Sequence, residues 1–163
     1  MDTTDQLGLN SDDSLGIWRV GPDSFQMFWP SVESILSEHP GGLLNFISID
    51  TVKELIQEGK LDLWIGLVNN EICLAGLTQF QGSVEKYLEV LWTGGSHFNQ
   101  LKGLAIDKLE KWGALHGADK IVLGGRLGLI RSMRSIGFEF HRIEVSKPLR
   151  YVRTDSGDLA WRN

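Results

Sequence analysis

The first candidate for chemistry is a pair of glycines, Gly94 and Gly95, which follows the apolar run of residues 86–93. A long amphipathic segment begins directly behind them, at Ser96 and His97. This order predicts a strand, a glycine turn and a helix. The start of a helix offers unpaired backbone N–H groups and partial positive charge, which suit a phosphate group. If the chain binds a phosphorylated cofactor, we expect these four residues to hold it; if the turn is empty, a structural or binding role is favoured.

Three arginines, Arg126, Arg131 and Arg134, cluster around the last predicted helix. Guanidinium groups form paired hydrogen bonds with phosphate and carboxylate, so the cluster could bind an anion, with Arg126 as the candidate cofactor contact. The alternative is a solvated face that balances acidic neighbours. We favour that alternative for the cluster, since most arginines in proteins are exposed.

The remaining reactive side chains do not form a catalytic or metal-binding set. The four histidines, His39, His97, His116 and His141, lack the spacing of a metal site, and one cysteine cannot complete it. Cys73 also has no partner for an internal disulfide, which favours a reducing compartment. No Ser-His-Asp or Cys-His combination can be argued, so we expect no metal and no nucleophilic side chain.

The periodicity of apolar residues predicts the elements that must position these groups. Strands are predicted at residues 15–20, 61–68, 71–80, 86–93, 119–123 and 137–145, and helices at residues 25–36, 51–57, 96–115 and 127–136. Pro30 is expected to kink the first helix, and Asn69-Asn70 to form a hairpin turn. In the long third helix one stripe is apolar, made of Phe98, Leu101, Ala105, Leu109 and Trp112. The charged residues expected off that stripe are Lys102, Lys108, Glu110 and Lys111.

The length and net charge of the chain limit its possible domain organisation and function. A chain of 163 residues can fold as one domain, and a net charge of −5 without a long basic run argues against a nucleic-acid surface. No apolar run approaches the length of a membrane span. We expect residues 1–14 to be an extension, residues 15–149 the domain and residues 150–163 a tail. Tyr151 and Trp161 in that tail suit a surface that contacts a partner.

The predicted order, β-α-α-β-β-β-α-β-α-β, is the arrangement of the GCN5-related N-acetyltransferases (GNAT). Sequence motifs extend the likeness: Asp62-Leu-Trp-Ile-Gly66, Leu88-Glu-Val-Leu-Trp-Thr-Gly-Gly95, Leu109-Glu-Lys-Trp112 with His116-Gly117, and Gly125-Arg-Leu-Gly128 with Arg134-Ser-Ile-Gly-Phe138. Over residues 15–149 the chain resembles a family of small GNAT-like proteins encoded by tailed bacteriophages and prophages. The resemblance implies one α+β or α/β domain, with a central mixed, mostly antiparallel sheet and helices on both faces.

The resemblance implies acetyl-CoA as the cofactor to expect, with its pyrophosphate at the glycine turn. A literal match to the family's phosphate loop exists at Gln100-Leu-Lys-Gly103-Leu-Ala105. Aligning the helix on Trp112 and Gly117 places this match about one turn too late. We therefore predict that Gln100 and Gly103 lie inside the helix, where backbone N–H groups are already bonded. The true loop position, residues 97–102, is crowded by side chains, which predicts a weak or vestigial site.

The resemblance also implies roles for three residues. Family members often deprotonate the acceptor amine with a carboxylate on the central strands, and Glu89 stands at that site; equally, it could be a partly buried carboxylate held by a cation. A tyrosine often protonates the leaving thiolate, but Met133 occupies its position and cannot donate a proton. Family members often have an asparagine seven residues before that tyrosine, and Arg126 occupies its position here. Both departures predict poor turnover.

Two functions follow, and the first is favoured. The chain would be a bacteriophage protein with an acetyltransferase-like fold, largely inactive, serving as a virion, tail or internal-core component or as an assembly factor. It would contact other phage proteins through Tyr151 and Trp161, in the host cytoplasm or in the virion. The alternative is an acyl-CoA-dependent N-acyltransferase that modifies a host protein or a small amine. A third, weaker hypothesis is a small binder directed against a host protein.

Overall fold

The computed structural model describes residues 15–124, 127–139 and 151–161. The strands of its main sheet are β1 (Leu15–Val20), β2 (Asp62–Val68), β3 (Glu71–Gln81), β4 (Tyr87–Gly95) and β5 (Lys120–Leu123). The helices are α2 (Trp29–Glu38), α3 (Ile49–Gln57), α4 (Phe98–Leu115) and α5 (Leu127–Arg134), with short 3-10 helices η1 (Phe25–Met27) and η2 (Gly42–Asn45). None of the helices in these ranges is long and apolar enough to cross a membrane.

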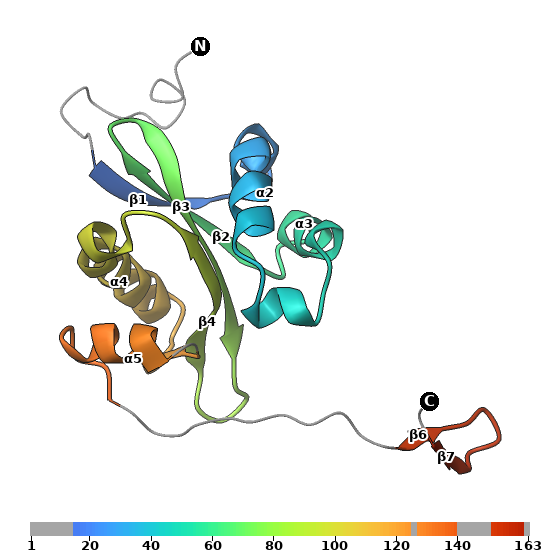
Figure 1. The fold of residues 1–163 in the computed structure, drawn as a ribbon. Coiled ribbons are helices and arrows are strands. Elements are labelled where there is room, and N and C mark those ends of the chain that lie inside the picture. Colours follow the sequence, from blue (N-terminus) through green and yellow to red (C-terminus); the bar gives the residue numbers. More distant parts are fainter. Residues whose placement is uncertain (1–14, 125–126, 140–150, 162–163) are drawn as a thin grey trace.

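The sheet runs in the order β1-β2-β3-β4-β5. Each neighbouring pair from β1 to β4 is antiparallel, and β4 pairs with β5 in parallel. Figure 1 shows α2 and α3 on one face of this sheet and α4 and α5 on the other. The expected mixed, mostly antiparallel sheet with helices on both faces is therefore confirmed.

The hairpin between β2 and β3 follows directly from its two turn residues. Asn69 and Asn70 have φ angles of 51° and 65°, a left-handed pair that matches the twist of the flanking strands. Asparagine tolerates this conformation better than most residues, so the predicted turn is confirmed.

The prediction that Pro30 kinks the first helix is wrong. The segment begins instead with η1, and α2 starts anew at Trp29 with Pro30 in its first turn. Proline is favoured at this place because its φ is already helical and its missing N–H would have no partner there. Phe25, completely buried, still packs edge-on against Trp29, so the two segments share one apolar face.

Each face of the sheet has its own apolar core. The core beneath α2 and α3 contains Leu63, Ile65, Leu67, Leu77 and Trp92, together with the buried residues of both helices. The core beneath α4 contains Ile17, Trp64, Leu88, Val90 and Leu101. A single strand can therefore supply side chains to both cores. In β4, Val90 lies in the core beneath α4 and Trp92, two residues later, in the core beneath α2.

Two contacts position α4 on the sheet. Near its start, Leu101 lies against Gly66 of β2, where an added Cβ would be 2.9 Å from the leucine Cδ1. Near its end, the indole of Trp112 donates a hydrogen bond of 3.2 Å to Asp62, which also forms an ion pair with Arg19 at 2.7 Å. The close approach and the polar contact hold both ends of the helix against the sheet.

The predictions for the chain ends had mixed outcomes. The last helix, α5, starts where it was predicted to start, at Leu127. Of the strand predicted at residues 137–145, only residues 137–139 are described, and they lie outside any strand. The predicted extension of residues 1–14 lies outside the described residues.

The predicted tail contains secondary structure that its composition did not indicate. It holds a separate two-stranded hairpin of β6 (Tyr151–Arg153) and β7 (Leu159–Trp161). The turn is closed by a 2.8 Å hydrogen bond from the Thr154 N–H to the Asp158 carbonyl, with Gly157 at a φ of 89°. The Asp-Ser-Gly sequence before Asp158 is a turn signal that could have predicted it.

Candidate functional site

An irregularity in β4 shapes the candidate site. Trp92 is opposite Leu77 of β3 and Val90 is opposite Thr78, so Leu91 is an extra residue, a β-bulge. Because side chains alternate along a strand, one extra residue reverses the faces beyond it. Val90 accordingly lies in the core beneath α4, whereas Trp92 lies in the core beneath α2.

The strands β4 and β5 stop pairing at this bulge. Their parallel register runs from Tyr87 opposite Lys120 to Val90 opposite Leu123, and β5 ends there. The strand β4 continues to Gly95, and no strand of the described chain pairs with residues 91–95 on that side. Within the described part of the chain, the edge of β4 is thus unpaired beside the bulge.

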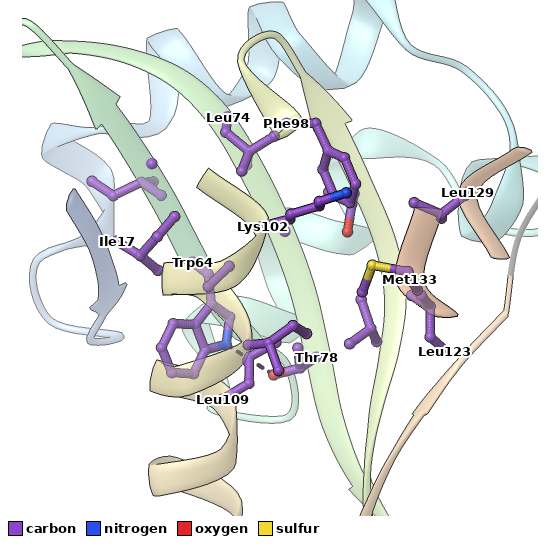
Figure 2. Close-up of a pocket in the computed structure, with 18 residues that line it drawn as sticks. Ile17, Trp64, Leu74, Thr78, Phe98, Lys102, Leu109, Leu123, Leu129 and Met133 are labelled. Carbon is purple, nitrogen blue, oxygen red and sulfur yellow. Dashed lines mark hydrogen bonds between the residues drawn. The ribbon is translucent and has the colours of Figure 1, made fainter. Parts of the chain in front are cut away.

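A small apolar cavity lies next to this opening, between the sheet, α4 and α5. Its volume is about 60 Å³, and its walls include Val90, Thr93, Leu123, Met133 and Lys102. Figure 2 shows Met133 and Leu129 on α5 facing Lys102 of α4 across this space. The Thr78 hydroxyl, also in the wall, accepts a 3.0 Å hydrogen bond from the Trp64 indole.

Lys102 was predicted to lie off the apolar stripe of α4, and this prediction is wrong. It lines the cavity half-buried, and its Nζ donates to the Ser132 hydroxyl of α5 at 2.8 Å and approaches the Ser132 carbonyl at 3.4 Å. The spacing could have predicted this position, because Lys102 is four residues after Phe98 and three before Ala105, and both of these lie on the stripe.

Gly94 and Gly95 lie in β4 and not in a turn, which corrects the prediction for this pair. They are opposite Ala75 and Leu74, because β3 starts early enough to pair with them. A Cβ on Gly94 would lie 2.4 Å from the ring of Trp92, and a Cβ on Gly95 2.2 Å from the Cys73 carbonyl. Their lack of side chains serves close packing of the strand, and the turn itself follows at Ser96 and His97.

The start of α4 has an unusual cap. His97 takes a left-handed conformation with a φ of 60°, and no side chain caps the helix; the predicted cap, Ser96, has its hydroxyl 2.9 Å from the His97 Nδ1. The N–H groups of Gln100 and Leu101 donate to the His97 carbonyl. Those of Phe98 and Asn99 have no acceptor within the described ranges, which is the donor pair that an anion at a helix start requires.

The literal phosphate-loop match lies within α4, as predicted from its register. Gln100 and Gly103 are the third and sixth residues of the helix Phe98–Leu115. Gly103 is exposed, and a Cβ there would meet no atom within 4 Å. A glycine at position 103 is therefore required neither for close packing nor for a special backbone conformation.

Replacing Gly103 with alanine should raise the free energy of unfolding by up to about 1 kcal/mol, because glycine weakens a helix interior. The affinity for acetyl-CoA should stay unchanged, since this backbone N–H lies inside the helix. Urea denaturation and calorimetry measure the two quantities. A marked loss of affinity would instead assign Gly103 to a phosphate loop.

Glu89 is half-buried and lies just before the point where β4 and β5 separate. Leu88 and Val90 face α4, so Glu89 faces the side of α2 and α3. Its carboxylate accepts a hydrogen bond of 3.4 Å from the Gln79 amide on β3. None of the ion pairs found among the described residues involves Glu89, so the alternative of a carboxylate held by a cation finds no partner there.

The three arginines do not form one site in the described part of the chain. Arg131 and Arg134 are exposed in the last turn of α5, as expected for a solvated face. Arg126 lies outside the described residues, so its predicted contact with a cofactor is still a prediction. Met133, at the position of the family's tyrosine, is buried in the cavity wall.

Cys73 and two histidines line a second, open cleft of about 650 Å³ between α2, the start of β3 and the Ser96-His97 turn. Burial raises the pKa of the Cys73 thiol, which reduces its nucleophilicity at neutral pH. His39 contacts the Ile35 carbonyl with its Nδ1 at 3.0 Å, which ties its ring to α2. No group of three metal-ligating side chains occurs among the described residues.

Solved structures with the same fold are acetyltransferases. An aminoglycoside acetyltransferase from an uncultured soil metagenomic sample matches with a TM-score of 0.63 at 11% identity, over 86% of this chain and 99% of its own. Glucosamine-6-phosphate N-acetyltransferase from Arabidopsis thaliana matches with a TM-score of 0.61 at 14% identity, over 82% and 97%. A predicted acetyltransferase with acetyl-CoA from Clostridium acetobutylicum gives 0.54 at 14%, over 82% and 96%.

These likenesses show that the chain has the GNAT acetyltransferase fold, with a single α/β domain and a five-stranded mixed sheet. They give no support to the predicted bacteriophage origin. No protein-family model and no curated protein sequence matches the chain.

Proposed function

We propose that this chain is an acyl-CoA-dependent N-acyltransferase that binds its acyl donor where β4 and β5 separate. The observation that carries the proposal is the bulge at Leu91, from which residues 91–95 have no strand partner on the β5 side among the described residues. The pantetheine arm of CoA contains two amides, and an open strand edge offers amides and carbonyls to pair with them. Acetyl-CoA is the proposed donor, since the small cavity beside Val90 and Leu123 suits a short acyl group.

The start of α4 would bind the pyrophosphate. The N–H groups of Phe98 and Asn99 point out of the helix start and carry the positive end of its dipole. Gly94, Gly95, Ser96 and His97 lead the chain to this point, and we keep them with Arg126 as proposed cofactor contacts. His97 stands where a smaller residue would allow closer approach, so we expect modest affinity.

The acceptor amine would approach from the face of α2 and α3, toward which Glu89 points. Glu89 would take the proton that the amine must lose before its nitrogen can attack the thioester carbonyl. The hydrogen bond from Gln79 keeps the carboxylate in place. The C–N bond then forms, the C–S bond breaks and CoA leaves as the thiolate.

Calorimetry and thermal unfolding with acetyl-CoA test the proposal. Acetyl-CoA at a hundred times its dissociation constant should stabilise the folded chain by about 2.7 kcal/mol. An Ala105→Phe variant, which fills the cavity, should lose this response. Ala114→Phe, the same change at an exposed position of α4, should keep it. A wild-type chain that gives neither heat nor a thermal shift at millimolar acetyl-CoA would rule the proposal out.

A second candidate function is a phage virion or assembly component, and Met133 supports only the low catalytic activity expected of it. A buried methionine in the cavity wall cannot donate a proton to a leaving group. In that case the β6–β7 hairpin, which carries Tyr151 and Trp161, would contact other phage proteins. Mass spectrometry of purified particles tests the virion form, and a particle without the chain would rule it out.

A further inference from the structure

Lys102 is the one charged side chain among the described residues that line the cavity between α4 and α5. Figure 2 shows it extending from α4 across the cavity toward α5. An ammonium group against apolar walls is costly unless it is hydrogen-bonded. Its two contacts with Ser132, at 2.8 and 3.4 Å, use two of its three hydrogens. The third has no acceptor among the described residues.

The surroundings of Lys102 match the place where the proposed reaction releases a thiolate. Val90 and Leu123, the last paired residues of β4 and β5, line the same cavity. A thioester at that separation would bring its sulfur to the cavity wall. Of the other wall residues nearby, Met133 and Leu129 have no hydrogen-bond donor, and the hydroxyls of Thr78 and Thr93 carry no charge to offset that of a thiolate.

We propose that the Lys102 ammonium, held by Ser132, donates a hydrogen bond to the leaving sulfur and stabilises its negative charge. The inference rests on the acyltransferase function proposed above. As the amine nitrogen bonds to the acyl carbon, the C–S electron pair moves to sulfur, and the thiolate forms beside the fixed ammonium. The thiolate takes its proton from solvent after release. Lys102 remains protonated throughout, so the step needs no other reactant.

CoA and desulfo-CoA, which lacks the sulfur, separate this role from general cofactor binding. The wild-type chain should bind CoA about tenfold more tightly than desulfo-CoA, as expected for a hydrogen bond to a charged group. Lys102→Met should bind both equally, and the thiolate's ultraviolet absorbance, seen with wild type and CoA, should be absent. Lys108→Met, on the exposed side of the same helix, should behave as wild type.

The outcomes distinguish the two proposals. A wild-type chain that binds neither ligand overturns the acyltransferase function, and the role of Lys102 with it. If CoA binds and Lys102→Met still prefers CoA to desulfo-CoA, the role of Lys102 is wrong while the donor site stands. Should Lys102→Met fail to fold, Ser132→Ala serves instead: it keeps the lysine but removes its anchor, and should narrow the tenfold preference. An unchanged preference in that variant would overturn the inference.

Discussion

Replacing Glu89 with glutamine should lower kcat for acyl transfer by a factor of about 10²–10⁴, the usual contribution of a general base. Glutamine has nearly the same shape, but its amide cannot take a proton from the amine. The affinity for acetyl-CoA should not change, because Glu89 faces α2 and α3 while the proposed donor site opens beside α4. Steady-state release of CoA thiol, with an amine acceptor that the wild-type chain accepts, measures kcat.

Glu85→Gln is the matched control for this experiment. Glu85 is an exposed carboxylate in the loop before β4, where it pairs with Lys120 at 3.0 Å. Its replacement changes the same charge four residues away and should leave kcat intact. If Glu89→Gln has the kcat of wild type, the carboxylate has a structural role through Gln79, and the base must be sought elsewhere.

Replacing Gly95 with alanine should lower the free energy of unfolding by about 2 kcal/mol or more. The φ of Gly95 is 119°, which costs side-chain-bearing residues about 1–3 kcal/mol. In addition, the new Cβ would lie 2.2 Å from the Cys73 carbonyl and 2.9 Å from the Leu74 Cα, so one strand must move. Because Ser96 and α4 follow directly, acetyl-CoA binding should weaken as well.

Urea denaturation at equilibrium measures this loss, with Gly103→Ala as its matched comparison. Both variants add one methyl group within nine residues of each other, but Gly103 has open space around it. The two should therefore change stability in opposite directions. A Gly95→Ala chain as stable as wild type would mean that the end of β4 does not pair with β3 as described.

The elements could be predicted because each has a local cause. Alternating apolar residues and the Asn69-Asn70 turn each depend on a few neighbouring residues. Pro30 was misjudged because the same residue breaks a helix interior and favours a helix start. Which effect applies depends on where the helix begins, and α2 begins at Trp29, directly before Pro30.

The candidate site was less predictable, because its geometry comes from contacts between distant residues. Glu89 could be named from its position, and the false match at Gln100 could be dismissed by counting turns. Whether Gly94 and Gly95 form a turn depends on how far β3 extends beside them, which their own sequence does not record. The cavity, and with it Lys102, forms only when α4 and α5 meet over the sheet.

The extra residue at Leu91 shifts the inward and outward alternation of side chains along β4 by one position. The even-numbered residues Leu88 and Val90 lie in the core beneath α4. After the extra residue, the even-numbered Trp92 lies in the core beneath α2. Every residue from Trp92 onward is therefore suited to its face only with that insertion in place. A gain or loss of one residue in this strand would exchange the two faces of its second half.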